Sequence, residues 1–159
     1  MPKMTDPTDA LTSFQRALLQ GLQLHPGTLD PDVFMHFDQP NGEPRFTYVR
    51  LDGQTVTALA NFTPNGHVDG SPCFSVGYAV PETLRNQGRA HQIVRDGIAE
   101  LRNGFKGHPP FHVEAIVSVD NAASIRVATS VIGGEAEAIV DDHSKQPALR
   151  YTAKYETGT

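Results

Sequence analysis

The sequence predicts a single α/β domain built on a mixed β-sheet with helices on its faces. In the first half, apolar and polar residues alternate on both sides of Asp52-Gly53, which is typical of a β-hairpin. The second half runs strand, helix, strand, helix and closes on another pair of alternating segments. Since 159 residues suit one hydrophobic core, we expect one domain over residues 1–159.

The first half is predicted to hold one helix followed by the hairpin. Helical spacing over residues 9–23 predicts an amphipathic helix with apolar positions Leu11, Phe14, Leu18 and Leu22. The short apolar segment 33–37 is left unassigned. Residues 46–51 and 54–63 alternate as paired strands do, and the turn formers between 64 and 72 predict an exposed loop.

The second half is predicted to alternate strands and helices. A strand over 73–80 precedes a helix over about 88–101, and the glycine and proline residues between 103 and 110 separate that helix from a strand over 111–119. Another helix starts near Asn121. Residues 135–140 and 148–155 read as a closing hairpin, because the second segment alternates strictly between two faces.

The stretch that joins the strand 73–80 to the next helix has the features of an anion-binding site. Residues 85–90 read Arg-x-x-Gly-x-Ala, and helical apolar spacing follows directly. The first turn of a helix leaves backbone N–H groups without intrahelical partners, and the helix dipole favours negative charge there. Gly88 allows close approach to the backbone, and Arg85 and Arg89 can bind phosphate oxygens. Alone, the pattern more often marks an ordinary strand-to-helix turn.

A second motif lies about thirty residues further along the chain. After the strand 111–119 comes Asn121-Ala122-Ala123-Ser124-Ile125-Arg126-Val127. In this order and spacing, the two motifs and the strand end Tyr78-Ala79-Val80 resemble the GNAT superfamily of acyl-CoA-dependent N-acetyltransferases, whose members carry Gln/Arg-x-x-Gly-x-Gly/Ala and then Asn-x-x-Ser/Ala-x-x-Val/Leu. The resemblance covers roughly the second half of the chain and says nothing of the acceptor.

The resemblance implies a GNAT-like, mostly antiparallel sheet in which the parallel strands 73–80 and 111–119 splay apart. Coenzyme A would lie in that opening, because splayed strands leave backbone groups that an amide-rich pantetheine arm can pair with. The implied donor is acetyl-CoA. Its implied binding residues are Tyr78, Ala79, Val80, Arg85, Asn86, Gln87, Gly88, Arg89, Ala90, Asn121 and Ser124.

The implied reaction is direct attack of a bound amine on the thioester, which needs a group that removes a proton from the ammonium form. Many family members also use a tyrosine to protonate the leaving thiolate. This chain departs from that pattern, because the matching position is Ala128 or Thr129. Thr129 is a candidate acid and Glu114 a candidate base. His112, His67 and Asp69 are further candidates for the base, and each of these side chains also fits an ordinary edge or loop residue.

Composition narrows the range of partners. A net charge of −5 argues against binding to a nucleic-acid backbone. The single cysteine, Cys73, excludes an intrachain disulfide, and the histidines show no metal-ligand spacing, so we expect no metal. No export signal or apolar membrane span is visible, so we expect a cytoplasmic protein with no membrane partner. A homodimer and a monomer stay equally open.

Two functions are consistent with these features. The first is an N-acetyltransferase that uses acetyl-CoA on a small amine or a protein amino group. The second is a non-catalytic module of the same fold that binds CoA or acyl-CoA as a regulatory ligand. The absent tyrosine and the lack of an evident base keep the second function open.

Overall fold

The computed structural model describes residues 7–142 and 144–158, which form one eight-stranded sheet in the order β1-β2-β3-β4-β5-β6-β8-β7. Neighbouring strands are antiparallel except β5 and β6, which are parallel. The elements are α1 (Pro7–Leu19), β1 (His25–Pro26), β2 (Val33–Asp38), η1 (Pro40–Gly42), β3 (Arg45–Asp52), β4 (Thr55–Val68), β5 (Ser71–Ala79), η2 (Glu82–Leu84), α2 (Arg89–Gly104), β6 (Phe111–Ser118), α3 (Ala122–Val131), β7 (Glu137–Val140) and β8 (Pro147–Tyr155).

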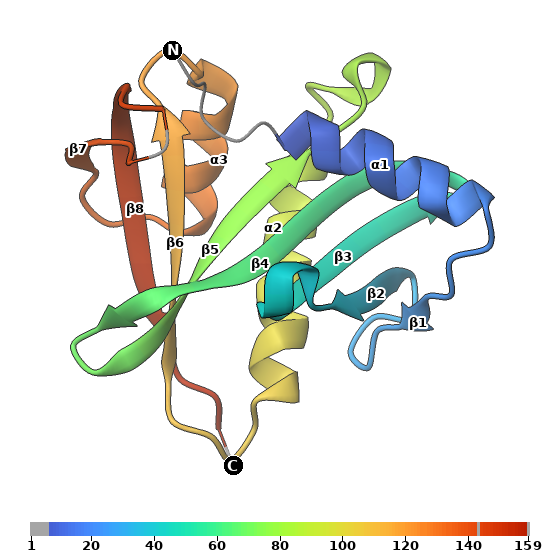
Figure 1. Cartoon of the computed structure of the whole chain (residues 1–159), viewed down its shortest axis with the longest axis horizontal. Helices are drawn as coiled ribbons and strands as arrows, with labels where there is room; N and C mark the ends of the chain where they lie inside the picture. Colours follow the sequence, from blue (N-terminus) through green and yellow to red (C-terminus); the bar gives the residue numbers. More distant parts are fainter. Residues whose placement is uncertain (1–6, 143, 159) are drawn as a thin grey trace.

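Helices cover both faces of the sheet (Figure 1). On one face, Leu11 of α1 packs against Val49, Val56 and Leu59 of β3 and β4. The Gln15 side chain fastens α1 to this hairpin, because its Oε1 accepts from Val56 N at 2.7 Å. On the other face, α2 and α3 bury their apolar sides against β3 to β6 and β8 in the larger core. None of the helices in the described ranges is long and apolar enough to cross a membrane.

The predicted fold class is confirmed, and so are the elements of the second half, whose ends differ from the predicted ones by a few residues. The helix predicted over 9–23 is α1, which ends at Leu19, four residues early, before Gly21 with φ of 100°. The unassigned segment 33–37 is strand β2, paired with β3.

The loop predicted over 64–72 is wrong, because β4 continues to Val68 and β5 already begins at Ser71. The pairing shifts register between Pro64 and His67, so one extra residue is taken up on β4. Gly66, with φ of 69°, supplies the left-handed conformation that such a bulge tolerates. The turn-forming residues therefore make a bulge and an exposed hairpin tip instead of a free loop.

A buried carboxylate holds the segment between β1 and β2 against α2. Glu100 of α2 is 7% exposed and accepts from the backbone N–H groups of Thr28 and Leu29, at 3.1 and 2.5 Å. Asp30 N also donates to it at 3.4 Å. Gly27 makes this approach possible, since a Cβ there would lie 2.8 Å from Glu100 Oε1 and 2.5 Å from the carbonyl oxygen of Asp30.

We expect Gly27→Ala to lower the free energy of unfolding by about 2 kcal/mol, because the new methyl group overpacks this segment. Chemical denaturation measures the change. Gly104→Ala is the matched control, since a Cβ at this helical position meets nothing within 4 Å. It should leave stability unchanged or raise it by up to about 1 kcal/mol. Equal stability of the two variants would contradict the packing described for Gly27.

Candidate functional site

The parallel strands β5 and β6 part in the middle of the sheet. They pair only through Cys73, Phe74 and Ser75 of β5, and the last partner on β6 is Glu114. Beyond that point β5 stays paired with β4 as far as Ala79, and β6 stays paired with β8 as far as Ser118. Figure 1 shows the two strands diverging toward the end of β5. Within the described ranges, the facing edges of β5 and β6 therefore have no ladder partner there.

The start of α2 presents free backbone donors. Gly88 is the N-cap with φ of 75°, Asn86 has φ of 63°, and no side chain caps the helix. The first helical bond runs from Gln92 N to Gly88 O at 3.1 Å. The N–H groups of residues 86–91 donate to no group within the described ranges. A Cβ on Gly88 would meet nothing within 4 Å, so the space beside this N-cap is open.

The two arginines of the motif have different partners. Arg85 Nε donates to the carbonyl oxygen of Val80 at 3.2 Å, which ties the loop back to the end of β5. Arg89 Nε donates to Gln87 Oε1 at 3.2 Å. Each guanidinium has five N–H donors. The remaining donors of both side chains are therefore available to an anion at the helix start.

Across the opening, the first turn of α3 is linked to β5. Asn121 Oδ1 caps the helix by accepting from Ser124 N at 3.1 Å. The Tyr78 hydroxyl donates to the carbonyl oxygen of Ser124 at 2.8 Å. Burial raises the pKa of Tyr78 to about 12, so its hydroxyl stays protonated at neutral pH. The side chain of Tyr78 thus joins α3 to the strand that lines the opening.

Thr129 lies further along α3 and has a phenol beside it. Its Oγ1 donates to the Tyr151 hydroxyl at 3.1 Å. Helix α3 has no tyrosine of its own, so Tyr151 of β8 is the tyrosine that lies beside it. Ala128, the other position that could match the family tyrosine, is fully buried. Tyr151 is buried in the core, as expected from its place on the apolar face of its strand.

Glu114 lies on the opposite face of the sheet from α2 and α3, because its neighbours Val113 and Ala115 point into the larger core. It is 1% exposed, and both carboxylate oxygens are engaged. Oε1 accepts from Arg150 Nε at 2.8 Å, and Oε2 accepts from the Asn65 amide. This buried carboxylate thus has a cationic partner, as a charge in an apolar setting requires.

The remaining candidates for the base lie on or beside the closed part of the sheet. His67 and Asp69 belong to the hairpin tip before β5, at the opposite end of that strand from the opening. His112 is buried, and its Nδ1 has no hydrogen-bond partner among the residues that the structure describes. Burial and nearby Glu114 raise the pKa of Cys73 to about 11, so its thiol is protonated at neutral pH and a poor nucleophile.

The fold brings the residues predicted to bind coenzyme A to one end of the sheet. Tyr78 to Val80, the 85–90 loop and the start of α3 surround the opening between β5 and β6. Glu114 and Thr129 lie on opposite faces of the sheet, Glu114 at the last paired position of β6 and Thr129 beside Tyr151 of β8. Sequence reasoning missed Arg150 and Asn65. Strand alternation does place Arg150 on the polar face of β8, but its partner is visible only once β6 and β8 are paired.

Within the described residues, no group of three metal-ligating side chains occurs.

Comparison with known proteins identifies the fold. No protein-family model matches the chain, and no curated protein matches it by sequence. Among solved structures, it resembles RimL, a ribosomal alpha-N-protein acetyltransferase in complex with coenzyme A, with a TM-score of 0.54 and 17% identity over 71% of this chain and 63% of that one. The chain therefore spans less than two thirds of the RimL chain.

Two further structures extend the comparison. The NatC complex bound to a Gag peptide and CoA gives a TM-score of 0.54 and 15% identity, over 69% of this chain and 70% of that chain. An acetyltransferase of the GNAT family from Streptococcus pneumoniae gives 0.53 and 12%, over 98% and 99% of the two chains. The protein therefore has the GNAT acetyltransferase fold.

We expect Arg150→Met to lower the free energy of unfolding by about 2 kcal/mol, because it leaves Glu114 buried without a cation. The loss is smaller than for a fully buried pair, since the Arg150 side chain is 28% exposed. Lys154→Met is the matched control. Lys154 lies on the same strand, and its side chain is 54% exposed, so its loss should cost less than about 0.5 kcal/mol. Equal costs in denaturant titrations would show that the ion pair does not stabilise the fold.

Proposed function

We propose that this protein is an N-acetyltransferase that transfers the acetyl group of acetyl-CoA to an amine. The observation that carries the proposal is the adjacency of two unsatisfied sets of backbone groups. One is the set of N–H groups at residues 86–91, and the other is the open edge of β5 beyond Ser75. The first suits a pyrophosphate, and the second suits the amides of a pantetheine arm.

The donor would bind with its pyrophosphate on the amides around Gly88. Arg85 and Arg89 would contribute charge-assisted hydrogen bonds from their free guanidinium donors. The pantetheine arm would pair with the backbone of Tyr78, Ala79 and Val80, in the place that β6 leaves vacant. The amide nitrogen of Asn121 has no partner within residues 7–142 and 144–158, since only its oxygen caps α3, and it would donate to the same arm. Ser124, in the same first turn of α3, would also lie beside the arm.

The proposed reaction is a direct attack in a ternary complex. The acceptor ammonium loses one proton, and its nitrogen attacks the thioester carbonyl carbon. Collapse of the oxyanion breaks the C–S bond and releases the CoA thiolate. The new amide nitrogen loses a second proton while the thiolate gains one, so one proton in all passes to solvent. A free backbone N–H of β5 would stabilise the oxyanion, an effect worth about 3 kcal/mol.

Two sets of side chains would handle these protons. Glu114, on the face that carries α1, would accept a proton from the ammonium through a water, since both of its oxygens already have protein partners. Thr129 or Tyr78 would donate to the thiolate from the face that carries α3. An acetyl-cysteine intermediate on Cys73 is disfavoured, because the thiol is buried and its pKa is raised.

The acceptor class is supported by the structural neighbours. RimL is an alpha-N-protein acetyltransferase, and the NatC structure holds a peptide. We therefore propose an amino group on a protein or a small molecule as the acceptor, with the reaction in the cytoplasm and no nucleic acid, membrane or metal involved. A homodimer is compatible with this function, and the reaction does not require one.

The competing function is a regulatory module that binds CoA without turnover. The engagement of both Glu114 oxygens and the absence of a tyrosine on α3 favour it. Both functions use the same CoA site, and they differ in whether the acetyl group is transferred. CoA binding and turnover therefore have to be measured separately.

We expect Gly88→Ala to weaken CoA binding at least about tenfold, because the new methyl group stands where the pyrophosphate approaches the backbone. Isothermal titration calorimetry with CoA measures this. Gly53→Ala is the matched control. Gly53 also has positive φ, 60° against 75°, and no neighbour within 4 Å, so both variants carry similar backbone strain of about 1 kcal/mol. Equal CoA affinity of the two variants would contradict the proposed donor site.

We expect thiol release from acetyl-CoA above background with at least one acceptor in a panel of peptides with free N-termini, lysine peptides and polyamines. A thiol reagent records the rate, and Gly88→Ala is the low-binding control. CoA binding without release for any acceptor would favour the regulatory module. Failure to bind CoA at millimolar concentration would remove both functions.

A further inference from the structure

A cavity separate from the donor site lies between α2 and the first strands. It has a volume of about 180 Å³ and is partly open to solvent. Its walls come from the C-terminal half of α2 and from the strands β2 and β3, and they include Met35, Phe46, Tyr48, Glu100, Leu101 and Phe105. Glu100 lies twelve residues after Gly88, which corresponds to about 18 Å along the helix axis. The cavity is therefore at the opposite end of α2 from the free N–H groups.

One wall of the cavity carries a negative charge without a cation. Glu100 is buried and bonded by the neutral amides of Thr28, Leu29 and Asp30. Within the described part of the chain, no lysine, arginine or histidine lies within ion-pair distance of its carboxylate. Backbone donors keep such a group solvated but leave its charge in place. A cation in the cavity would be attracted to it.

A second wall carries an unused hydroxyl. Tyr48 is 5% exposed, and its hydroxyl makes no hydrogen bond with any group of residues 7–142 and 144–158. Burial, followed by the charge of Glu100, raises its pKa far above the ordinary value, so the group is a neutral donor and acceptor. Buried tyrosine hydroxyls usually have a partner. Since Tyr48 lines the cavity, a molecule bound in the cavity could supply the missing hydrogen-bond partner.

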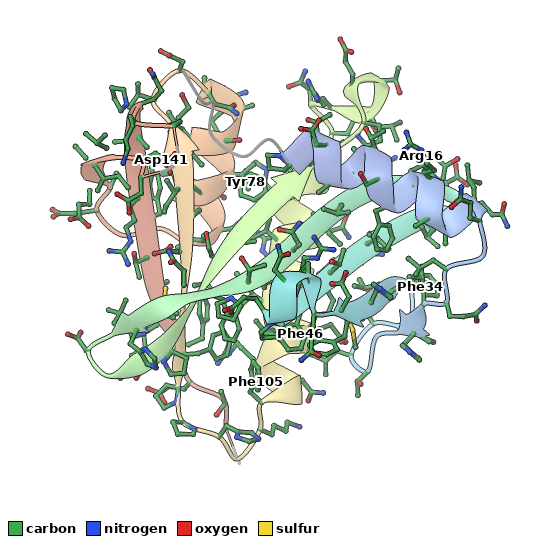
Figure 2. The ribbon with its side chains drawn as sticks, in the orientation of Figure 1. Arg16, Phe34, Phe46, Tyr78, Phe105 and Asp141 are labelled. Atoms are coloured by element: carbon green, nitrogen blue, oxygen red, sulfur yellow. The ribbon has the colours of Figure 1, made fainter. Side chains whose placement is uncertain are left out.

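The remaining walls are apolar and aromatic. Phe46 and Phe105 meet edge to face, with their centroids 6.0 Å apart, and Figure 2 shows them side by side. Aromatic faces attract cations and bury apolar groups equally well. An engineered cavity of roughly 150 Å³ holds a benzene molecule. The space here thus suits one ring or a short alkyl chain with a few further atoms.

We infer that this cavity binds a small organic ammonium ion, with the apolar part against Phe46, Phe105 and Met35. The ammonium group donates to the Tyr48 hydroxyl oxygen and to the Glu100 carboxylate. This site is separate from the acetyl-transfer site, and its existence does not depend on the proposed function.

The test compares three probes of one shape on the native protein: benzylammonium, benzyl alcohol and benzoate. Two-dimensional amide NMR titrations report both affinity and place. We expect benzylammonium to bind at least about tenfold more tightly than either other probe, with shifts centred on residues 27–28 and 100–105. Equal affinities, no binding at 10 mM, or shifts centred on Glu114 instead would overturn the inference.

The hydroxyl is tested with Tyr48→Phe, which keeps the ring. We expect benzylammonium affinity to fall about fivefold, as for one lost hydrogen bond, while benzyl alcohol stays as weak as before. Tyr155→Phe is the matched control, since Tyr155 lies outside the cavity, and it should not change the affinity. An unchanged affinity in folded Tyr48→Phe would overturn the role of Tyr48. If that variant does not fold, the order of the three probes on the native protein decides the inference.

Discussion

The structure depends on the early end of the pairing between β5 and β6. Each strand is held on its outer side, β5 by β4 and β6 by β8, over a length that exceeds their contact with each other. Backbone groups on the two inner edges are consequently left without partners, a costly arrangement in a folded protein unless a ligand or water satisfies them. The free donors at the start of α2 lie at the same end. The opening between β5 and β6 therefore presents unpaired backbone groups and ends at a helix start with free N–H donors.

The two faces of the sheet carry different polar side chains near this opening. The face covered by α2 and α3 brings hydroxyl groups, from Tyr78 on one strand and from the Thr129–Tyr151 pair on α3 and β8. The other face brings a buried carboxylate balanced by Arg150. Helix α2 adds a further contrast, since its start presents free N–H donors and its end lines a cavity with a carboxylate that has no cationic partner among the described residues.

Sequence reasoning was most reliable where the pattern was local. The Gly88 turn, the helix start near Asn121 and the alternation of β8 each depend on a few neighbouring residues, and the structure has all three. It was wrong for residues 64–72, where turn-forming residues predicted a loop. Pairing with β5 on both sides of Gly66 outweighed local turn chemistry and absorbed the extra residue as a bulge. The partners of Glu114 were out of reach, because Asn65 and Arg150 lie 49 and 36 residues away.

By itself, the sequence determined the fold class, the order of the strands and helices in the second half, and the glycine turn at which α2 begins. These follow from periodicity, glycine conformation and helix capping, which act over a few residues. Only the tertiary structure decided which edges stay open, which carboxylate is neutralised, and that Tyr48 and Glu100 share a cavity. Those features come from contacts between distant segments, and the chain must be folded before such groups meet or fail to find a partner.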